Sequence, residues 1–346
     1  MKRIALALLA ALSFAGQAQV VAPNVAIPFY TPPAFMQGVH RDWYAPRARE
    51  FAAATAALQP ALERLCSATG PEPLREARLR WQAAAVAWDK LAAVAVGPIL
   101  QRRSIRQIDF TPTRPELIAR AIEAQPADSK AMERVGTPAK GLPALEWLLW
   151  TRPVTANSPG CRYAVVAAAE VDTEARALVT AFTELAERDW ETEDEAAVAG
   201  MGELLNQWVG GIERLRWTNM EKPLKSAGGK PPAFPRAASG TTRQSWAAQW
   251  QGLAAIGAAS GNAVPVPGAG LVPLETYLRG RGLNPLANKL ATAAAQVGKQ
   301  VDGLAPADNN KTLAATRALS GLKRLAEADM APALEVNIGF SDADGD

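Results

Sequence analysis

The sequence predicts an all-α protein made of two duplicated helical bundles packed side by side. Apolar residues recur at three- and four-residue steps along most of the 346 residues, which is the spacing of amphipathic helices. Alternating β-branched runs bounded by Asn-Gly or Asp-Gly turns are missing, so a substantial sheet is not expected. A weak internal repeat, described below, predicts the duplication.

Composition excludes several classes of protein and of site. Hydrophobic residues make up 49% of the chain and charged residues 21%, which is typical of a globular protein. The formal charge is only +3 and the basic residues are scattered, so we expect no nucleic-acid partner. The single histidine, His40, and the two cysteines, Cys66 and Cys161, exclude a two-histidine zinc site and a four-thiolate site within one chain.

The first 35 residues read as an export signal followed by an extended lead-in. Lys2 and Arg3 precede an apolar run over 4–15 and a small-residue cleavage pattern at 16–18, which together are typical of a cleaved Sec signal peptide over 1–18. No lipobox cysteine follows it. Residues 19–35 contain four prolines and are expected to be extended rather than helical. These features predict a periplasmic protein.

Helical patterns then divide the chain into an N-terminal bundle over 36–220 and a C-terminal bundle with an acidic tail over 241–346. Residues 221–240 hold four prolines and several glycines and are expected to be a Pro/Gly-rich linker. The helices are expected at 44–65, 72–95, 163–186, 193–217, 243–259, 271–279, 285–301 and 311–330. In the second of these, Leu79, Ala83, Val86, Trp88 and Leu91 are expected to form the buried face.

Two echoes on either side of the linker indicate duplication. Gly-Leu-x-x-Leu-Glu-x-x-Leu occurs at 141–149 and again at 270–278. Gly211-Ile-Glu-Arg-Leu is matched by Gly321-Leu-Lys-Arg-Leu in the same order. The alternative is chance similarity between leucine-rich helices.

Cys66 and Cys161 stand 95 residues apart, and in an oxidising compartment they could form a disulfide. Two buried thiols that pack as small apolar side chains are the alternative. The sequence leaves the choice open.

Glu146 is the acidic side chain that most invites a functional explanation. Residues 137–146 read as a loop that opens a helix, with Gly141 and Pro143 near its first turn. Glu146 is followed by the apolar run Trp147–Trp150, and a carboxylate embedded there needs a partner or a bound cation. Simple stabilisation by the helix dipole is the alternative explanation.

Arg106 and Asp109 form a second candidate pair. They are three residues apart and would share a face if this stretch is helical. A solvated surface pair is the alternative.

These segments together resemble the imelysin family. Residues 141–150 are similar to its Gly-x-His-x-x-Glu pattern and apolar continuation, in the form Gly-Leu-Pro-Ala-Leu-Glu found in a branch of predicted periplasmic lipoproteins. Gly97-Pro98 with Arg106 and Asp109, and the Ser239-Gly-Thr-Thr stretch, are similar to that branch as well. The resemblance covers about residues 36–346 and implies two related bundles with a site at their interface, together with an association with iron uptake.

The family also carries the older description of metallopeptidase, and here the chain departs from the pattern. Pro143 stands where the family has histidine, so Glu146 is the only member of the pair that could bind a metal. We therefore expect a non-catalytic periplasmic binding component for iron or an iron complex. Glu146 is the expected metal ligand, and the expected ligand-binding residues are Glu146, Gly141, Pro143, Trp147, Arg106 and Asp109. A metal-dependent peptidase and a scaffold that docks an outer-membrane or transport partner are the alternatives.

Overall fold

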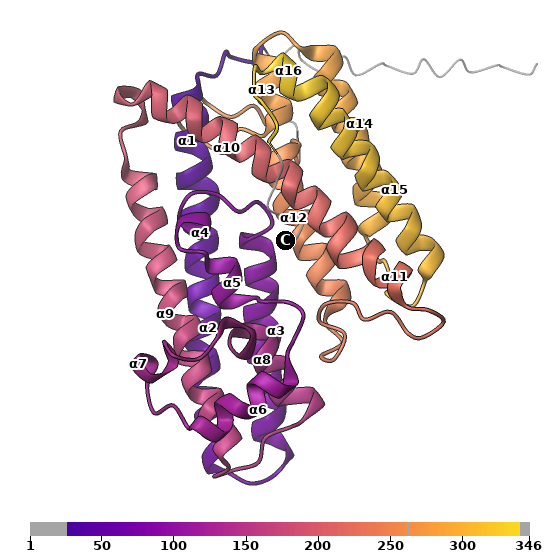
Figure 1. Cartoon of the computed structure of the whole chain (residues 1–346). Helices are drawn as coiled ribbons and strands as arrows, with labels where there is room; N and C mark the ends of the chain where they lie inside the picture. Colours follow the sequence, from indigo (N-terminus) through magenta and orange to yellow (C-terminus); the bar gives the residue numbers. More distant parts are fainter. Residues whose placement is uncertain (1–25, 262, 340–346) are drawn as a thin grey trace, which may run out of the picture.

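The computed structural model describes residues 26–261 and 263–339, and they fold into two helical bundles that lie against each other (Figure 1). The predicted signal peptide and the end of the predicted acidic tail lie outside the described residues. Within the described ranges the only bridge between extended residues is an isolated one, from Val266 to Ala269. The all-α prediction is confirmed.

Three long helices form the N-terminal bundle. They are α2 (Ala45–Ser67), α3 (Pro71–Leu91) and α9 (Pro159–Glu187), with α2 packed between the other two. Shorter helices cover this bundle: α4 (Pro98–Gln101), α5 (Ser104–Ile108), α6 (Pro115–Ala124), α7 (Ser129–Met132), η2 (Thr137–Ala139), α8 (Gly141–Glu146) and η3 (Trp147–Thr151). A disulfide between Cys66 and Cys161 joins the end of α2 to the beginning of α9.

The C-terminal bundle contains α12 (Thr242–Gly257), α14 (Asn284–Val301) and α15 (Asn309–Leu325). The shorter α13 (Leu274–Gly280), η6 (Ala326–Met330) and α16 (Ala331–Ala333) complete it. Helix α10 (Asp194–Glu213), its continuation η5 (Arg214–Glu221) and α11 (Lys222–Ser226) connect the bundles. Helices α10 and η5 pack on α15 and α12. The boundary predicted at residue 220 therefore falls within η5, in a segment that the two bundles share.

The expected extended lead-in is wrong over its last residues, because α1 spans Pro32–Gly38. Prolines 32 and 33 occupy the first turn, where a missing N–H costs no hydrogen bond. The Thr31 hydroxyl caps this turn by accepting a hydrogen bond from the Ala34 N–H at 3.2 Å. The π-helix η1 (Val39–Tyr44) then leads into α2, and η4 (Trp190–Thr192) joins α9 to α10.

The predicted buried face of α3 is wrong in part. Leu79 is 52% exposed, whereas Trp81 and Asp89 are buried. Helix α3 packs on α2 with one side and on α12 with another, so its buried surface is wider than one apolar stripe. This second contact, between α3 and α12, is the central part of the seam between the bundles.

No helix among the described residues has the length and apolar character needed to cross a membrane.

Candidate functional site at the seam

Residues 227–241, which we call the seam loop, are exposed over 228–231 and then turn inward, where part of the loop lies between the two bundles. Arg236, Ser239 and Thr241 in this loop are all buried. The Arg236 carbonyl accepts hydrogen bonds from the Thr241 N–H at 3.0 Å and from the Ser239 hydroxyl at 3.0 Å. The Gln82 amide of α3 donates to the Thr241 hydroxyl at 3.1 Å, which fastens the loop to the N-terminal bundle.

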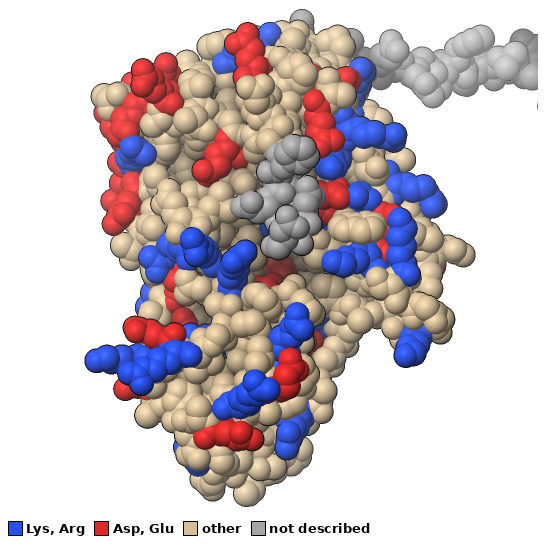
Figure 2. Space-filling model, viewed as in Figure 1, with Lys and Arg blue, Asp and Glu red and all other residues tan. Residues whose placement is uncertain are grey.

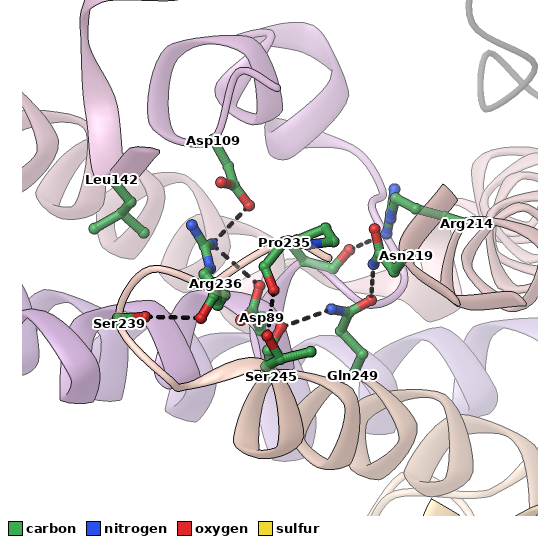
Figure 3. A network of polar contacts seen from close by, with 12 residues as sticks. Asp89, Asp109, Leu142, Arg214, Asn219, Pro235, Arg236, Ser239, Ser245 and Gln249 are labelled. Carbon is green, nitrogen blue, oxygen red and sulfur yellow. Dashed lines mark hydrogen bonds and ion pairs between the residues drawn. The ribbon is translucent and has the colours of Figure 1, made fainter. Parts of the chain in front are cut away.

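Arg236 is the central cation of the seam. Only 4% of it is exposed, and its φ of +63° is a left-handed conformation that costs energy in a residue with a side chain. Its guanidinium donates to Asp109 Oδ2 at 2.8 Å and to Asp89 Oδ1 at 3.3 Å (Figure 3). The guanidinium also lies over the Trp81 ring, 5.5 Å from its centre, which is a cation–π arrangement.

The surrounding carboxylates hold this guanidinium in its charged form. Burial alone would lower the pKa of Arg236. The negative charges of Asp109 and Asp89, and then of Glu146, outweigh burial, so the pKa lies above its ordinary value. Arg236 is therefore positively charged.

Each aspartate uses one carboxylate oxygen for Arg236 and has a second one that is buried. Asp89 Oδ2 and Asp109 Oδ1 have no hydrogen-bond partner among the described residues. Burial raises the pKa of Asp89 above its ordinary value. Arg236 opposes this shift, the negative charge of Asp109 adds to it, and the nearby Ser245 hydroxyl acts in the same direction as Arg236. A buried acceptor without a partner costs about 1–3 kcal/mol, so these two oxygens favour a ligand that donates to them.

Both aspartates line a small cavity in the seam of about 90 Å³, together with Trp88, Arg214 and Asn219. Arg214 reaches in from η5 and donates to the Ala92 and Ala93 carbonyls at 2.5 and 3.0 Å. Burial lowers the pKa of Arg214, while the nearby carboxylates act in the opposite direction. The cavity thus has two carboxylates and two guanidinium groups in its wall.

A chain of amides closes the other side of the cavity (Figure 3). The Asn219 amide donates to Gln249 Oε1 at 2.7 Å, and the Gln249 amide donates to the Ser245 hydroxyl at 3.1 Å. These residues come from η5 and α12, whereas the aspartates belong to the N-terminal bundle. The cavity is therefore assembled only when the two bundles meet.

Glu146 lies beside this cluster, at the end of α8. It is 7% exposed, and its Oε1 accepts a hydrogen bond from the Ser239 N–H of the seam loop at 2.9 Å. Helix α8 is held against α3 because the Trp81 indole donates to the Leu142 carbonyl at 2.9 Å. The structure therefore has Glu146 buried, in contact with the loop that leads to the C-terminal bundle.

Gly141 permits this placement of α8. Its φ is +71°, and a β-carbon built there would lie 2.3 Å from the Ile108 carbonyl oxygen. Only glycine accommodates both the left-handed backbone and this close approach.

The repeat of the motif offers an internal comparison. Glu275, which matches Glu146, is also buried, and it accepts a backbone hydrogen bond from the Ala259 N–H at 2.9 Å. Glu275 additionally binds Arg279 of its own helix, at 2.6 Å. Both glutamates therefore accept a hydrogen bond from a backbone N–H. The arginine that balances the negative charge comes from a different part of the chain in each case.

The other predicted site residues are distributed over the N-terminal bundle. Asp109 is at the seam, but its partner is Arg236 rather than Arg106, which is exposed on α5. Gly141 faces a different cavity, beside Lys140 and Glu170, and Pro143 is buried within α8. Trp147 lines a third cavity and stacks with Arg152, 5.9 Å away. Of the six candidates, Glu146 and Asp109 reach the seam cluster.

Asp89, Arg236 and Arg214 were missed by the sequence analysis. Asp89 interrupts an apolar helical face directly after Trp88, which is a signal that could have been used. Arg236 stands in a segment rich in proline, where no periodicity marks a residue as buried.

The described residues contain no group of three or more His, Cys, Asp and Glu side chains placed to hold a metal ion. Asp89 and Asp109 could supply two oxygens to one cation, and Arg236 already lies against both. The residues therefore do not fit a closed metal site with three or more protein ligands. A cation in the cavity would keep water or other ligands of its own.

Comparison with known proteins agrees with this fold. The family model described as Imelysin matches residues 44–329. A search of curated proteins gives no match. An imelysin-like protein from Psychrobacter arcticum has a similar structure, with a TM-score of 0.72 and 21% identity over 91% of this chain and 100% of that one. A putative iron-regulated protein A precursor from Parabacteroides distasonis has a TM-score of 0.67 and 13% identity, over 88% and 95%.

Proposed function

The chain belongs to the imelysin family, and we propose that it is an exported, non-catalytic binding protein associated with iron uptake, whose ligand enters the seam cavity. The observation that carries this proposal is the pair of buried carboxylate oxygens, Asp89 Oδ2 and Asp109 Oδ1, that have no partner within the described part of the chain. The name of the Parabacteroides structure, an iron-regulated protein, supports the association with iron. The disulfide supports an oxidising compartment such as the periplasm.

The size of the cavity limits the ligand. About 90 Å³ corresponds to roughly three water molecules at about 30 Å³ each. A hard cation that keeps only about two or three waters, or the metal-bearing end of a small chelate, fits this volume, whereas a complete haem does not. Carboxylate oxygens are the donors that hard cations such as ferric iron prefer.

The ligand set also explains why we propose binding rather than peptidase activity. A catalytic metal site needs about three protein ligands, an open position for water and a base. Pro143 has no side chain that could serve as a ligand, and Glu146 is engaged with Ser239. The wall has two aspartates and two arginines, so only the two unpartnered carboxylate oxygens are available to a cation, which would keep its other ligands.

Titration with ferric citrate tests the proposal, with zinc chloride and haem as comparison ligands. Trp88 lines the cavity and provides a fluorescence signal for binding. Ligand present at 100 times its Kd stabilises the folded chain by about 2.7 kcal/mol, so the melting temperature should rise by several degrees. We expect ferric citrate to produce both changes and haem to produce neither.

Two variants locate the effect. Asp109→Asn should remove most of the response because it deletes one of the two free oxygens, whereas Glu116→Gln, on the exposed surface of α6, should leave it intact. An unchanged response in Asp109→Asn would place the ligand elsewhere, and the absence of any response in the unmodified chain would overturn the proposed function.

A further inference from the structure

A much larger cavity lies away from the seam, where α9, α10, η1 and the beginning of α4 meet. Its volume is about 670 Å³, which is within the range of about 300–1,000 Å³ typical of small-molecule sites. None of the seam residues lines it. Its wall combines an apolar interior with carboxylates at the opening, and we call it the α9–α10 pocket.

The interior of this pocket is apolar and partly aromatic. Met36, Leu204 and Trp190 line it and are almost completely buried. Gly200 on α10 makes room for Met36, whose methyl group lies 2.8 Å from where a β-carbon would stand. Such a wall suits the hydrocarbon part of an organic ligand.

His40, the only histidine of the chain, also forms part of the wall. It is 3% exposed and stacks on Trp190 with ring centres 5.1 Å apart. Its Nδ1 is buried and has no hydrogen-bond partner among the described residues. A buried ring nitrogen without a partner is costly, so this residue favours a ligand that hydrogen-bonds to the imidazole.

The charges at the pocket have one predominant sign. Glu184, Glu187 and Glu203 line it, and Arg188 is its only lining lysine or arginine. Arg188 forms an ion pair with Glu193, outside the pocket, which offsets part of its charge and leaves the three lining glutamates in excess. The Glu203 Oε1 accepts the Gly97 N–H at 2.6 Å, which holds this carboxylate at the wall.

The surroundings extend this negative character. Figure 2 shows acidic side chains gathered over the end of α9 and the beginning of α10, at the upper left of the view. In sequence this surface includes Asp189, Glu191, Asp194 and Glu195. A concave site lined by one sign of charge concentrates ligands of the opposite charge.

We propose that the α9–α10 pocket binds a small organic ammonium ion. The apolar body lies against Trp190 and Met36, and the ammonium group lies at the opening, near Glu184 and Glu187. His40, which stacks on Trp190, completes the aromatic part of this wall. This site is independent of the one proposed at the seam.

Calorimetric titration with phenethylammonium chloride at pH 7 and low ionic strength tests the proposal. The uncharged analogue phenethyl alcohol and the anion phenylacetate have the same ring and differ in charge. We expect the ammonium ion to bind at least about tenfold more tightly than the alcohol, a difference of about 1.4 kcal/mol, and the anion to bind more weakly than either.

Two double variants with equal changes in charge separate the pocket from the general acidic surface. Glu184→Gln with Glu187→Gln removes two lining carboxylates, and Glu191→Gln with Glu195→Gln removes two that lie outside the lining. All four side chains are exposed, so both variants should fold. The first should weaken binding about tenfold and the second less than about twofold.

Three results would overturn the assignment: no binding of the ammonium ion, equal affinity for ammonium and alcohol, or equal losses in the two double variants. Asp109→Asn serves as an independent check. It should leave ammonium binding unchanged, so that failure at the seam and failure at this pocket are distinguished.

Discussion

Glu146 and Glu275 occupy equivalent positions in the two bundles but are neutralised differently. The residue four positions after Glu275 is Arg279, which binds it within one helix. The residue four positions after Glu146 is Trp150, and the positive charge that acts on Glu146 comes from Arg236 in the seam loop. The N-terminal copy therefore depends on a segment from the other side of the seam.

Arg236→Met should be strongly destabilising. It leaves Asp89, Asp109 and Glu146 close together without their shared cation, and loss of one partner from a buried ion pair costs about 3–5 kcal/mol. Denaturation in urea at pH 7 measures the change. Arg106→Met, at an exposed arginine, is the matched control and should change stability by less than about 0.5 kcal/mol. Equal effects of the two substitutions would contradict the role assigned to Arg236.

His40 should make the protein less stable in acid. Burial, and then the charge of Arg188, lowers the pKa of His40 to about 4 from 6.5. The folded state therefore resists protonation, so stability that is fully present above pH 6.5 is lost as the pH falls toward 4. The shift corresponds to about 3 kcal/mol, at 1.36 kcal/mol for each pH unit.

Urea denaturation at pH 7 and pH 4.5 measures this contribution, in the unmodified chain and in His40→Gln. The variant removes the titrating group but keeps the carboxylates that also respond to acid, so the difference between the two chains isolates His40. We expect the variant to lose about 2–3 kcal/mol less than the unmodified chain between these pH values. Identical losses would show that His40 is not buried in its neutral form.

At the scale of elements, α8 is positioned by its glycine. Gly141→Ala places a β-carbon against the Ile108 carbonyl and forces a positive φ on alanine, so it should destabilise the fold by more than about 1 kcal/mol. Gly202→Ala is the matched control: it lies inside α10 with nothing within 4 Å of the added carbon, and it should stabilise the helix by up to about 1 kcal/mol. Thermal unfolding distinguishes these opposite signs, and two effects of the same sign would contradict the account.

The disulfide fixes the end of α2 to the beginning of α9. Replacing Cys66 and Cys161 together by serine removes a cross-link that closes a 95-residue loop. In the chain-entropy description the loss is at most about 4–5 kcal/mol. Thermal unfolding should give the same lowered melting temperature for the serine variant and for the unmodified chain treated with a thiol reductant. The unmodified chain without reductant should melt at a higher temperature. An unchanged melting temperature after complete reduction would contradict a stabilising role.

For the molecule as a whole, the sequence predicts the helices well because their apolar periodicity is local. All eight predicted helical segments correspond to helices of the structure, although several boundaries differ by a few residues. The lead-in was wrong over 32–35 because proline is excluded from a helix interior but not from its first turn.

The seam was only partly predictable. Glu146 could be recognised because a carboxylate interrupts an apolar run. Arg236 and Asp89 could not be paired from the sequence, since 147 residues separate them and no local pattern shows which face of α3 meets α12. Arg236 and Ser239 lie in the predicted linker, where no pattern marks them as part of the cluster.

The proposed cation site at the free oxygens of Asp89 and Asp109 can be tested by equilibrium dialysis against ferric citrate, with the bound iron counted per chain. We expect about one iron for each unmodified chain and background levels for folded Asp109→Asn, because one of the two available oxygens is gone. Equal iron contents in the two proteins, or none in either, would show that no cation binds at these oxygens.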